Sequence, residues 1–411
     1  MEKVLPKLRF PEFNYSWELK NLEKIAKRGT GHTPDKKHNE YYNGGIKWIS
    51  LADSNKLDNG KIYKTKINIS ELGIKNSSAV IHPENTVLLS RDAGVGKSAI
   101  MSENMAVSQH FVTWFGNKNE LDNYFLYYKL QILKPIFEKI AVGNTIKTIG
   151  MPFFKNLKIT IPKYSEQQKI ASFLTSIDER LSLLAQQKEK LELYKKGVMQ
   201  QIFSQKLRFK DENGKNYPDW EEKNFNEIID RTSTGLNPRQ NFTLGKGNNY
   251  YVTIKNISNG KLDFRSCEMI DDDALKLIKK RSDLSKNDII MSSIGNIGEA
   301  YLLKEEPTNW NINESVFMIR SKKEVVMPLF MYYILSNDYT KRYFENNMTG
   351  SSFKSIKIGD LKLMPVEVPC LEEQQKIALF LSAIDVQIEG VSKKIEQTKL
   401  FKKGLLQQMF V

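Results

Sequence analysis

Apolar and polar positions follow the same helical period in two separate parts of the chain. Residues 165–203 and 372–410 contain no proline, and their apolar side chains recur at steps of four and three. Such steps place apolar side chains along one stripe of an α-helix, and a helix of this kind buries the stripe against a partner helix. Each segment therefore predicts one helix of about 40 residues, which at about 1.5 Å per residue is about 60 Å long.

The two segments are copies of one sequence. They align without a gap at an offset of 207 residues, and 18 of 39 positions are identical. We expect the helices to pair with each other as an antiparallel coiled coil, which would relate the two halves of the chain by a pseudo-two-fold axis. Two separate amphipathic helices are the alternative. Lys195 and Lys402 interrupt the stripes at matched places. The stripe residues are Ile170, Leu174, Ile177, Leu181, Leu184, Ile377, Leu381, Ile384, Ile388 and Val391.

Two local features of these helices carry further expectations. Ser165 with Gln168 predicts a capping box at the start of the first helix. Gly197 and Gly404 stand at matched positions, although a glycine inside a helix costs about 1 kcal/mol relative to alanine. Their duplication indicates either a close approach of another backbone or a break in each helix.

Each repeated segment follows a globular stretch, and the two stretches share scattered sequence. Leu8-Arg9-Phe10 recurs as Leu207-Arg208-Phe209, and Trp17 recurs as Trp220. We interpret the two tryptophans as core residues. Runs rich in β-branched and aromatic residues predict strands at 46–49, 86–89, 111–114, 250–254, 288–291 and 316–319.

The globular stretches also contain shorter helices. One is expected from Tyr124, capped by Asp122 or Asn123, and its counterpart from Leu329. Pro135 is expected to kink or end the first of these. The resulting fold class is α+β, with two globular mixed α/β regions separated by the long helices. The predicted segments are 1–162, 163–205, 206–369 and 370–411.

Composition favours a polyanionic partner. The formal net charge is +14 and the isoelectric point is near 9.3, and lysine and arginine gain affinity for nucleic acid by releasing counterions from phosphates. Cys267 and Cys370 match neither a disulfide framework nor a zinc spacing, which fits a reducing compartment. The sequence contains neither an apolar signal core nor a stretch long enough for a membrane span, so we expect a cytoplasmic protein without membrane contact.

Residue patterns that resemble catalytic motifs are incomplete. Gly94-Val95-Gly96-Lys97-Ser98 resembles the end of a phosphate-binding loop, but such a loop needs glycine where the chain has Arg91. All four histidines lie in the first half, so a duplicated metal or catalytic site would lack ligands in the second. We find no methyltransferase motif. We therefore expect no catalytic residue, no metal and no cofactor in this chain.

The doubled arrangement resembles the specificity subunit of type I restriction–modification systems. The resemblance covers the whole chain and is carried by the duplicated helices that begin with Glu166-Gln167-Gln168-Lys169-Ile170 and Glu373-Gln374-Gln375-Lys376-Ile377. It implies two target-recognition domains that each read one part of a split double-stranded DNA site. It also implies that the helices dock two methylation subunits, which bind S-adenosylmethionine, and that motor-nuclease subunits using ATP and Mg²⁺ join for cleavage.

Base contacts are expected from loop residues with long polar side chains, because sequence is read by hydrogen bonds to base edges. The candidates are Lys36, Lys37, Arg91, Gln109, Lys147, Arg239, Gln240, Asn296 and Lys354. Of these, Lys147 and Lys354 follow matched loops and would contact phosphate. Two alternatives to this function are a self-sufficient restriction–methylation enzyme, for which we find no motifs, and a repeat-built scaffold or RNA-binding protein.

Overall fold

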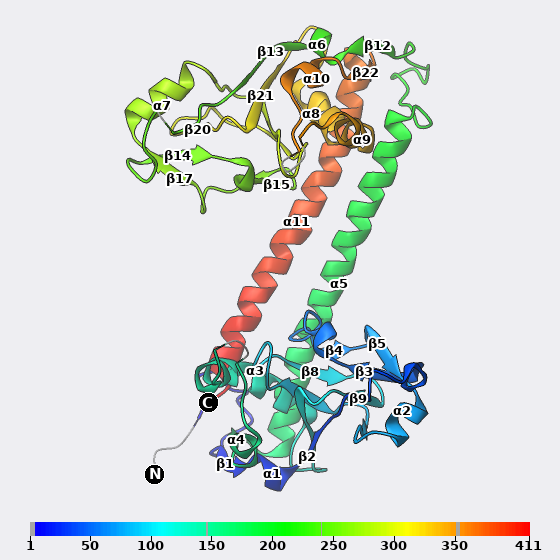
Figure 1. The fold of residues 1–411 in the computed structure, drawn as a ribbon, viewed down its shortest axis with the longest axis vertical. Helices are drawn as coiled ribbons and strands as arrows, with labels where there is room; N and C mark the ends of the chain where they lie inside the picture. Colours follow the sequence, from blue (N-terminus) through cyan, green and yellow to red (C-terminus); the bar gives the residue numbers. More distant parts are fainter. Residues whose placement is uncertain (1–4, 145–146, 240, 351–353) are drawn as a thin grey trace. The chain divides into compact units, whose positions relative to one another are not determined.

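The computed structural model describes residues 5–144, 147–239, 241–350 and 354–411. The chain forms two compact units. Unit 1 contains residues 1–187 and 391–411, and unit 2 contains residues 188–390. Each unit therefore consists of one globular region and about half of each long helix (Figure 1). This division differs from the four predicted segments, because each helix is shared between both units instead of forming a domain of its own.

The globular region of unit 1 is built mainly from short strands. Its strands are β1 (Glu18–Asn21), β2 (Ala26–Thr30), β3 (Tyr42–Ile49), β4 (Lys61–Ile62), β5 (Ile67–Ile69), β6 (Ile81–His82), β7 (Val87–Ser90), β8 (Ser98–Met101), β9 (Met105–Val107), β10 (Phe111–Gly116) and β11 (Lys158–Ile161). Its helices are α1 (Leu22–Ile25), α2 (Glu71–Lys75), α3 (Asn123–Ile140) and α4 (Met151–Lys155). The sheets have the orders β2-β10-β7-β8-β4, β5-β3-β9-β6 and β1-β11.

Unit 2 repeats this plan. Its strands are β12 (Glu221–Asn224), β13 (Ile229–Thr234), β14 (Asn249–Val252), β15 (Ile257–Ser258), β16 (Lys261–Leu262), β17 (Glu268–Ile270), β18 (Ile289–Ser292), β19 (Ala300–Leu302), β20 (Trp310–Ile312), β21 (Val316–Ser321) and β22 (Pro365–Val368). Its helices are α6 (Phe225–Ile228), α7 (Asp272–Lys279), α8 (Pro328–Ser336), α9 (Asp338–Asn347) and α10 (Ile358–Lys362). The sheets have the orders β13-β21-β18-β19, β17-β14-β20, β12-β22 and β15-β16. The first three correspond to the sheets of unit 1, but the two larger ones each have one strand fewer than their counterparts.

The six predicted strands are all present, with some ends displaced by a few residues. The mixed helix and strand content, repeated in two units, confirms the α+β class and the internal repeat. Asp122 caps α3 by accepting a hydrogen bond from the Phe125 amide at 2.9 Å. Helix α3 continues through Pro135 to Ile140. Of the two outcomes expected for this proline, an end of the helix is therefore wrong, and a kink stays a prediction. The phosphate-loop-like segment 94–98 lies in the turn between β7 and β8, with Ser98 as the first residue of β8.

The two long helices are α5 (Tyr164–Phe203) and α11 (Leu371–Met409), as predicted. Helix α5 begins before Ser165, because the amides of Glu166 and Gln167 already bond to the Lys163 carbonyl. Ser165 is therefore not the N-cap. Both helices pass uninterrupted through their glycines, so the expected helix break is wrong. A Cβ atom at Gly197 or Gly404 would meet no atom of the described residues within 4 Å, so no described backbone of this chain comes close there.

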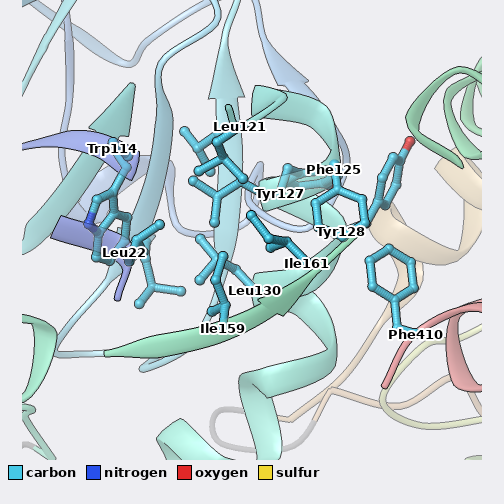
Figure 2. Packing of buried hydrophobic residues seen from close by; sticks show 14 of the residues in the cluster. Leu22, Trp114, Leu121, Phe125, Tyr127, Tyr128, Leu130, Ile159, Ile161 and Phe410 are labelled. Carbon is cyan, nitrogen blue, oxygen red and sulfur yellow. The ribbon is translucent and has the colours of Figure 1, made fainter. Parts of the chain in front are cut away.

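Each core includes the end of the helix that belongs to the other repeat. In unit 1, Phe410 at the end of α11 stacks on Phe125 of α3 with ring centroids 5.1 Å apart, and Figure 2 shows it beside Phe125 and Tyr128. In unit 2, Phe203 at the end of α5 stacks on Phe330 of α8 at 5.8 Å. Trp17 and Trp220 each pack edge-on against one of these pairs. Trp17 is a buried core residue as predicted, whereas Trp220 is half-buried and packs against the core of unit 2.

One lysine lies in the core of unit 1 without an aspartate or glutamate partner among the described residues. Lys129 of α3 is 2% exposed, and its ammonium donates to the Val411 carbonyl. Burial lowers the pKa of this lysine to about 8, since desolvation disfavours the charged form. The matched position of α8 in unit 2 carries the buried Ile334. An apolar side chain therefore suits this place in the fold.

We predict that Lys129→Met stabilises unit 1 at neutral pH by about 1–3 kcal/mol. The folded-state pKa lies below that of the unfolded chain, so wild-type stability should rise as pH increases from about 8 to about 10.5. The advantage of the variant should shrink over the same interval. Denaturant unfolding of both proteins at pH 7 and pH 10 measures this. An equal difference at the two pH values would contradict a buried, titrating lysine.

Candidate nucleic-acid interface

Backbone hydrogen bonds join several loops at one end of the main sheet of unit 1. The His32 amide donates to the Val107 carbonyl at 3.1 Å, and the Arg91 amide donates to the His110 carbonyl at 3.0 Å. The Arg91 carbonyl accepts from the Ile149 amide at 2.8 Å. We call this group loop cluster 1, and it consists of residues 31–38, 91–97, 108–110, 142–144 and 147–149.

Loop cluster 1 contains all five DNA contacts predicted in the first half. Four of them are exposed, namely Lys36, Lys37, Gln109 and Lys147. Arg91 is half-buried, and its Nε atom has no hydrogen-bond partner among the described residues. The Thr33 hydroxyl donates to the Gln109 side chain at 2.5 Å, which connects two of the loops. The structure thus brings these residues onto one group of loops, while their contact with DNA stays a prediction.

The equivalent loops of unit 2 are joined by similar backbone hydrogen bonds, two of which are at equivalent positions. The Gly235 amide donates to the Asn313 carbonyl at 3.1 Å, and the Ser293 amide donates to the Ser315 carbonyl at 3.0 Å. The Ser293 carbonyl accepts from the Ile356 amide at 3.0 Å. Loop cluster 2 consists of residues 235–239, 293–298, 313–315, 349–350 and 354–356.

Three predicted contacts lie in loop cluster 2, and all are exposed: Arg239, Asn296 and Lys354. Gln240 lies outside the described residues. Sequence reasoning missed Glu314, an exposed residue at the tip of the β20–β21 turn. The sequence did contain a signal for this residue. Gln109 and Glu314 each lie two residues before the first residue of the matched strands β10 and β21, so they occupy equivalent positions.

The side chains of the two clusters suit nucleic-acid recognition. Amide, carboxylate and guanidinium groups can hydrogen-bond to base edges, and lysines can neutralise phosphates. Next to Arg91, the Asp92 carboxylate lies 2.8 Å from the Nδ1 atom of the His110 ring. This acidic side chain of cluster 1 therefore already has a hydrogen-bond partner within the cluster. Among the described residues, no group of three or more potential metal ligands occurs. No described helix is both long and apolar enough to cross a membrane.

The duplicated Glu-Gln motif attaches each globular region to a long helix. Glu166 is buried and accepts from Arg9 at 2.7 Å and from the Trp17 indole at 3.3 Å. In unit 2 Glu373 accepts from Arg208 at 2.8 Å and from Trp220 at 3.1 Å. These hydrogen bonds raise the pKa of both arginines.

The following glutamine continues the attachment. The Gln167 amide group bonds to the Asp122 amide at 3.0 Å, the Glu120 carbonyl at 3.0 Å and the Pro162 carbonyl at 2.9 Å. Gln374 makes the same kind of contacts, with Met327 and Val325 before α8 and with Pro369 before α11. The repeated residues therefore serve the attachment of each globular region.

The two lysines that interrupt the apolar stripes form matched ion pairs. Lys402 of α11 bonds to Asp178 of α5 at 2.6 Å, and Asp178 also accepts the Tyr128 hydroxyl at 2.8 Å. In unit 2 the two helices exchange roles, because Lys195 of α5 bonds to Asp385 of α11 at 2.6 Å. The Tyr333 hydroxyl completes this second group at 2.8 Å from Asp385, where burial and the aspartate charge raise the pKa of the tyrosine. Within each unit, the two helix halves and the globular region meet at these groups.

The apolar stripe is occupied within the chain. Seven of its predicted docking residues are buried, namely Ile170, Leu174, Ile177, Ile377, Leu381, Ile384 and Val391. The other three, Leu181, Leu184 and Ile388, are half-buried. The seven buried side chains are therefore packed within the chain, and docking of a partner at the stripe residues stays a prediction.

Comparisons with known proteins agree with this organisation. Residues 14–193 and 217–399 match the model of the type I restriction modification DNA specificity domain. The chain is 24% identical over 402 residues to the type I restriction enzyme MjaIX specificity subunit of Methanocaldococcus jannaschii, covering 96% of this chain and 92% of that protein. It is 26% identical over 422 residues to the MjaVIII specificity subunit of the same organism, covering 98% and 93%.

The fold is also similar to that of a solved structure. The S subunit of a type I restriction–modification system from M. genitalium superimposes with a TM-score of 0.62, at 18% identity, over 99% of both chains. At this identity the likeness concerns the fold. The family model matches both halves of the sequence, each over one globular region and most of its long helix. The chain therefore belongs to the type I restriction modification DNA specificity family, whose members are the non-catalytic subunits that recognise the DNA target.

Proposed function

We propose that each unit reads one part of a bipartite DNA target, and that the long helices hold two methylation subunits. The main support is the pair of loop clusters, in which the same backbone contacts carry different side chains. Arg239 of cluster 2, for example, corresponds to Asp35 of cluster 1. Each lies four residues after a matched glycine, Gly31 or Gly235, and directly after a proline. Two sets of base contacts on one scaffold suit two different half-sites.

We predict that Arg239→Ala changes recognition of the half-site read by unit 2 and leaves the other half-site unchanged. Loss of one specific base contact typically costs about 1–3 kcal/mol of discrimination. Lys36→Ala is the matched variant in unit 1 and should affect the other half-site, or lower affinity evenly if Lys36 contacts phosphate. Sequencing of methylated sites made by the assembled complex gives both results. Relaxed recognition in both half-sites by either variant would contradict independent reading.

Docking is proposed on exposed apolar side chains that occur twice on the helices. Leu193 and Tyr194 on α5 are 64% and 53% exposed, and their equivalents Leu400 and Phe401 on α11 are 70% and 57% exposed. Each pair lies directly before a lysine of the matched ion pairs. Exposed apolar groups that recur at equivalent positions indicate a surface that a partner covers. Two equivalent surfaces suit two copies of one methylation subunit.

We expect Leu193→Asp with Tyr194→Asp to remove one methylation subunit from the complex, because charged side chains would face the apolar contact. Leu400→Asp with Phe401→Asp should remove the other, and the fourfold variant should remove both. Native mass spectrometry reports the stoichiometry. Leu19→Asp, at a 64% exposed leucine of β1, is the control and should keep both subunits. Retention of both by the fourfold variant would refute this surface.

Deletion of residues 370–411 is a poorer test of docking. It removes Leu405, Met409 and Phe410 from the core of unit 1, and Ile377 and Leu381 from the core of unit 2. Loss of assembly would then reflect unfolding. In the proposed complex S-adenosylmethionine is bound by the methylation subunits, and ATP with Mg²⁺ by the motor-nuclease subunits that join them.

A further inference from the structure

The turns before β10 and β21 have the same backbone geometry. Residues 108–110 link β9 to β10, and residues 313–315 link β20 to β21. Three hydrogen bonds are shared by the two turns. The Ser108 amide donates to the Ile49 carbonyl as the Asn313 amide donates to the Val252 carbonyl, both at 2.9 Å, and the Phe111 amide donates to the Ser108 carbonyl as the Val316 amide donates to the Asn313 carbonyl, both at 3.2 Å. The Arg91 amide donates to the His110 carbonyl as the Ser293 amide donates to the Ser315 carbonyl, both at 3.0 Å. Gln109 and Glu314 therefore occupy equivalent positions at the tips of the turns.

Both side chains are exposed, and each is contacted by one hydroxyl group. The Thr33 hydroxyl donates to the Gln109 carboxamide oxygen at 2.5 Å. The Tyr251 hydroxyl lies 3.3 Å from Glu314 Oε2 and 2.8 Å from the Leu236 carbonyl. Burial and the charge of Glu314 raise the pKa of Tyr251, so this hydroxyl stays a donor. The Tyr251 hydroxyl has a single proton, which the Leu236 carbonyl and the carboxylate share, so the contact with Glu314 is the weaker of the two. The Glu314 Oε1 atom has no donor among the described residues.

A carboxylate at this place needs a specific explanation on a DNA-binding surface. The chain has a net charge of +14, and the neighbouring loops carry the exposed Arg239 and Arg281, whose guanidinium donates to Thr234 at 3.1 Å. A carboxylate is repelled by phosphates, so it suits a DNA contact only where a base presents an amino group. In the major groove, cytosine presents the N4 amino group, and a carboxylate is its usual partner.

The two tips differ in the pattern of hydrogen bonds that they can make. The Gln109 carboxamide contains one donor and one acceptor group, which matches the N7 and N6 edge of adenine. The Glu314 carboxylate has acceptors alone, and adenine N7 would repel its second oxygen. Resting on the proposed function, we infer that Glu314 reads a cytosine in the half-site of unit 2, and that Gln109 reads an adenine at the equivalent place in the half-site of unit 1.

The test uses the full chain assembled with its methylation subunits and maps the methylated sites on genomic DNA. Glu314→Gln changes one oxygen to nitrogen and keeps the shape of the side chain. Preference at one C·G pair in the half-site of unit 2 should fall about ten-fold or more, with A·T gaining, since a correct base contact is worth about that factor. The half-site of unit 1 should be unchanged. Gln109→Glu should do the reverse, converting one A·T preference in the half-site of unit 1 towards C·G.

Tyr251→Phe separates base reading from support of the loop. It removes a hydroxyl that bonds mainly to the Leu236 carbonyl of the neighbouring loop and leaves the Glu314 carboxylate in place. It should therefore weaken binding to all sites evenly, with the base preference retained. An equal loss at every base in Glu314→Gln, an unchanged recognition pattern, or a unit 2 half-site without any C·G requirement would overturn the inference. If Glu314→Gln does not assemble, Gln109→Glu alone decides it. If the wild-type complex shows no sequence-specific methylation, the proposed function itself fails, which is a distinct result.

Discussion

Replacing Glu166 with alanine is expected to lower the free energy of unfolding of unit 1 by about 3–5 kcal/mol, because it removes one partner of a buried ion pair. The Glu166 side chain is 2% exposed and the Arg9 side chain 13% exposed. The same carboxylate also accepts the Trp17 indole, so the substitution leaves a guanidinium and an indole without their acceptor. Glu373→Ala should have a similar effect on unit 2, where Arg208 and Trp220 hold the equivalent contacts.

The control for this prediction lies two residues away. Gln168 belongs to the same repeated motif but is exposed, so Gln168→Ala should change stability by less than about 0.5 kcal/mol. The double variant Arg9→Met with Glu166→Ala should recover part of the loss, since it removes both charges. Thermal unfolding of the full chain measures all three. Equal effects of Glu166→Ala and Gln168→Ala would show that the repeated motif does not fix the globular region to its helix.

The long helices could be predicted from the sequence because the period of their apolar side chains depends only on the spacing of nearby residues. It did not predict what the repeated glutamates bind, because Arg9 lies 157 residues before Glu166 in the chain. Lys195 and Lys402 appeared in the sequence as defects of the apolar stripe. Their aspartate partners lie on the other long helix, so the role of each lysine becomes visible only when the helix halves are placed together.

The candidate interface shows the same limit. Loop residues such as Gln109 and Arg239 were identifiable by side-chain type, and the structure places them in the two loop clusters. Glu314 was not, because an acidic residue in a basic chain does not suggest contact with DNA. Its equivalence to Gln109 rests on backbone hydrogen bonds that connect residues up to 61 positions apart, as between Asn313 and Val252. Seven of the ten stripe residues are buried within the chain, which the sequence period alone could not show, because the side chains that cover them are distant in the sequence.

A fragment of residues 1–205 is expected to form a homodimer. In the full chain the core of unit 1 is completed by Leu405, Met409 and Phe410 of α11. At an offset of 207, the fragment carries Val198, Ile202 and Phe203 at the equivalent places. The end of α5 from a second copy can therefore fill each core with side chains of similar size and chemistry.

Polar contacts favour the same exchange. Asp178 pairs with Lys402 in the full chain, and the second copy offers Lys195 at the matched position. The Leu8 amide donates to the Gln408 carbonyl at 2.9 Å, just as the Leu207 amide donates to the Gln201 carbonyl at 3.0 Å. Without a second copy, the apolar surfaces of α5 and of the core would be exposed, and exposed surfaces of that kind favour association.

A homodimer of this fragment has two-fold symmetry, so both globular regions must read the same half-site. We expect methylation directed to an inverted repeat of the half-site of unit 1, with no requirement for that of unit 2. Analytical ultracentrifugation gives the oligomeric state, and mapping of methylated sites gives the target. Lys195→Glu in the fragment places a carboxylate opposite Asp178 and should shift the equilibrium towards monomer, while Lys190→Glu, at an exposed position of α5, should not. A monomeric wild-type fragment, or methylation still confined to an asymmetric target, would show that the two halves of the chain are not interchangeable units.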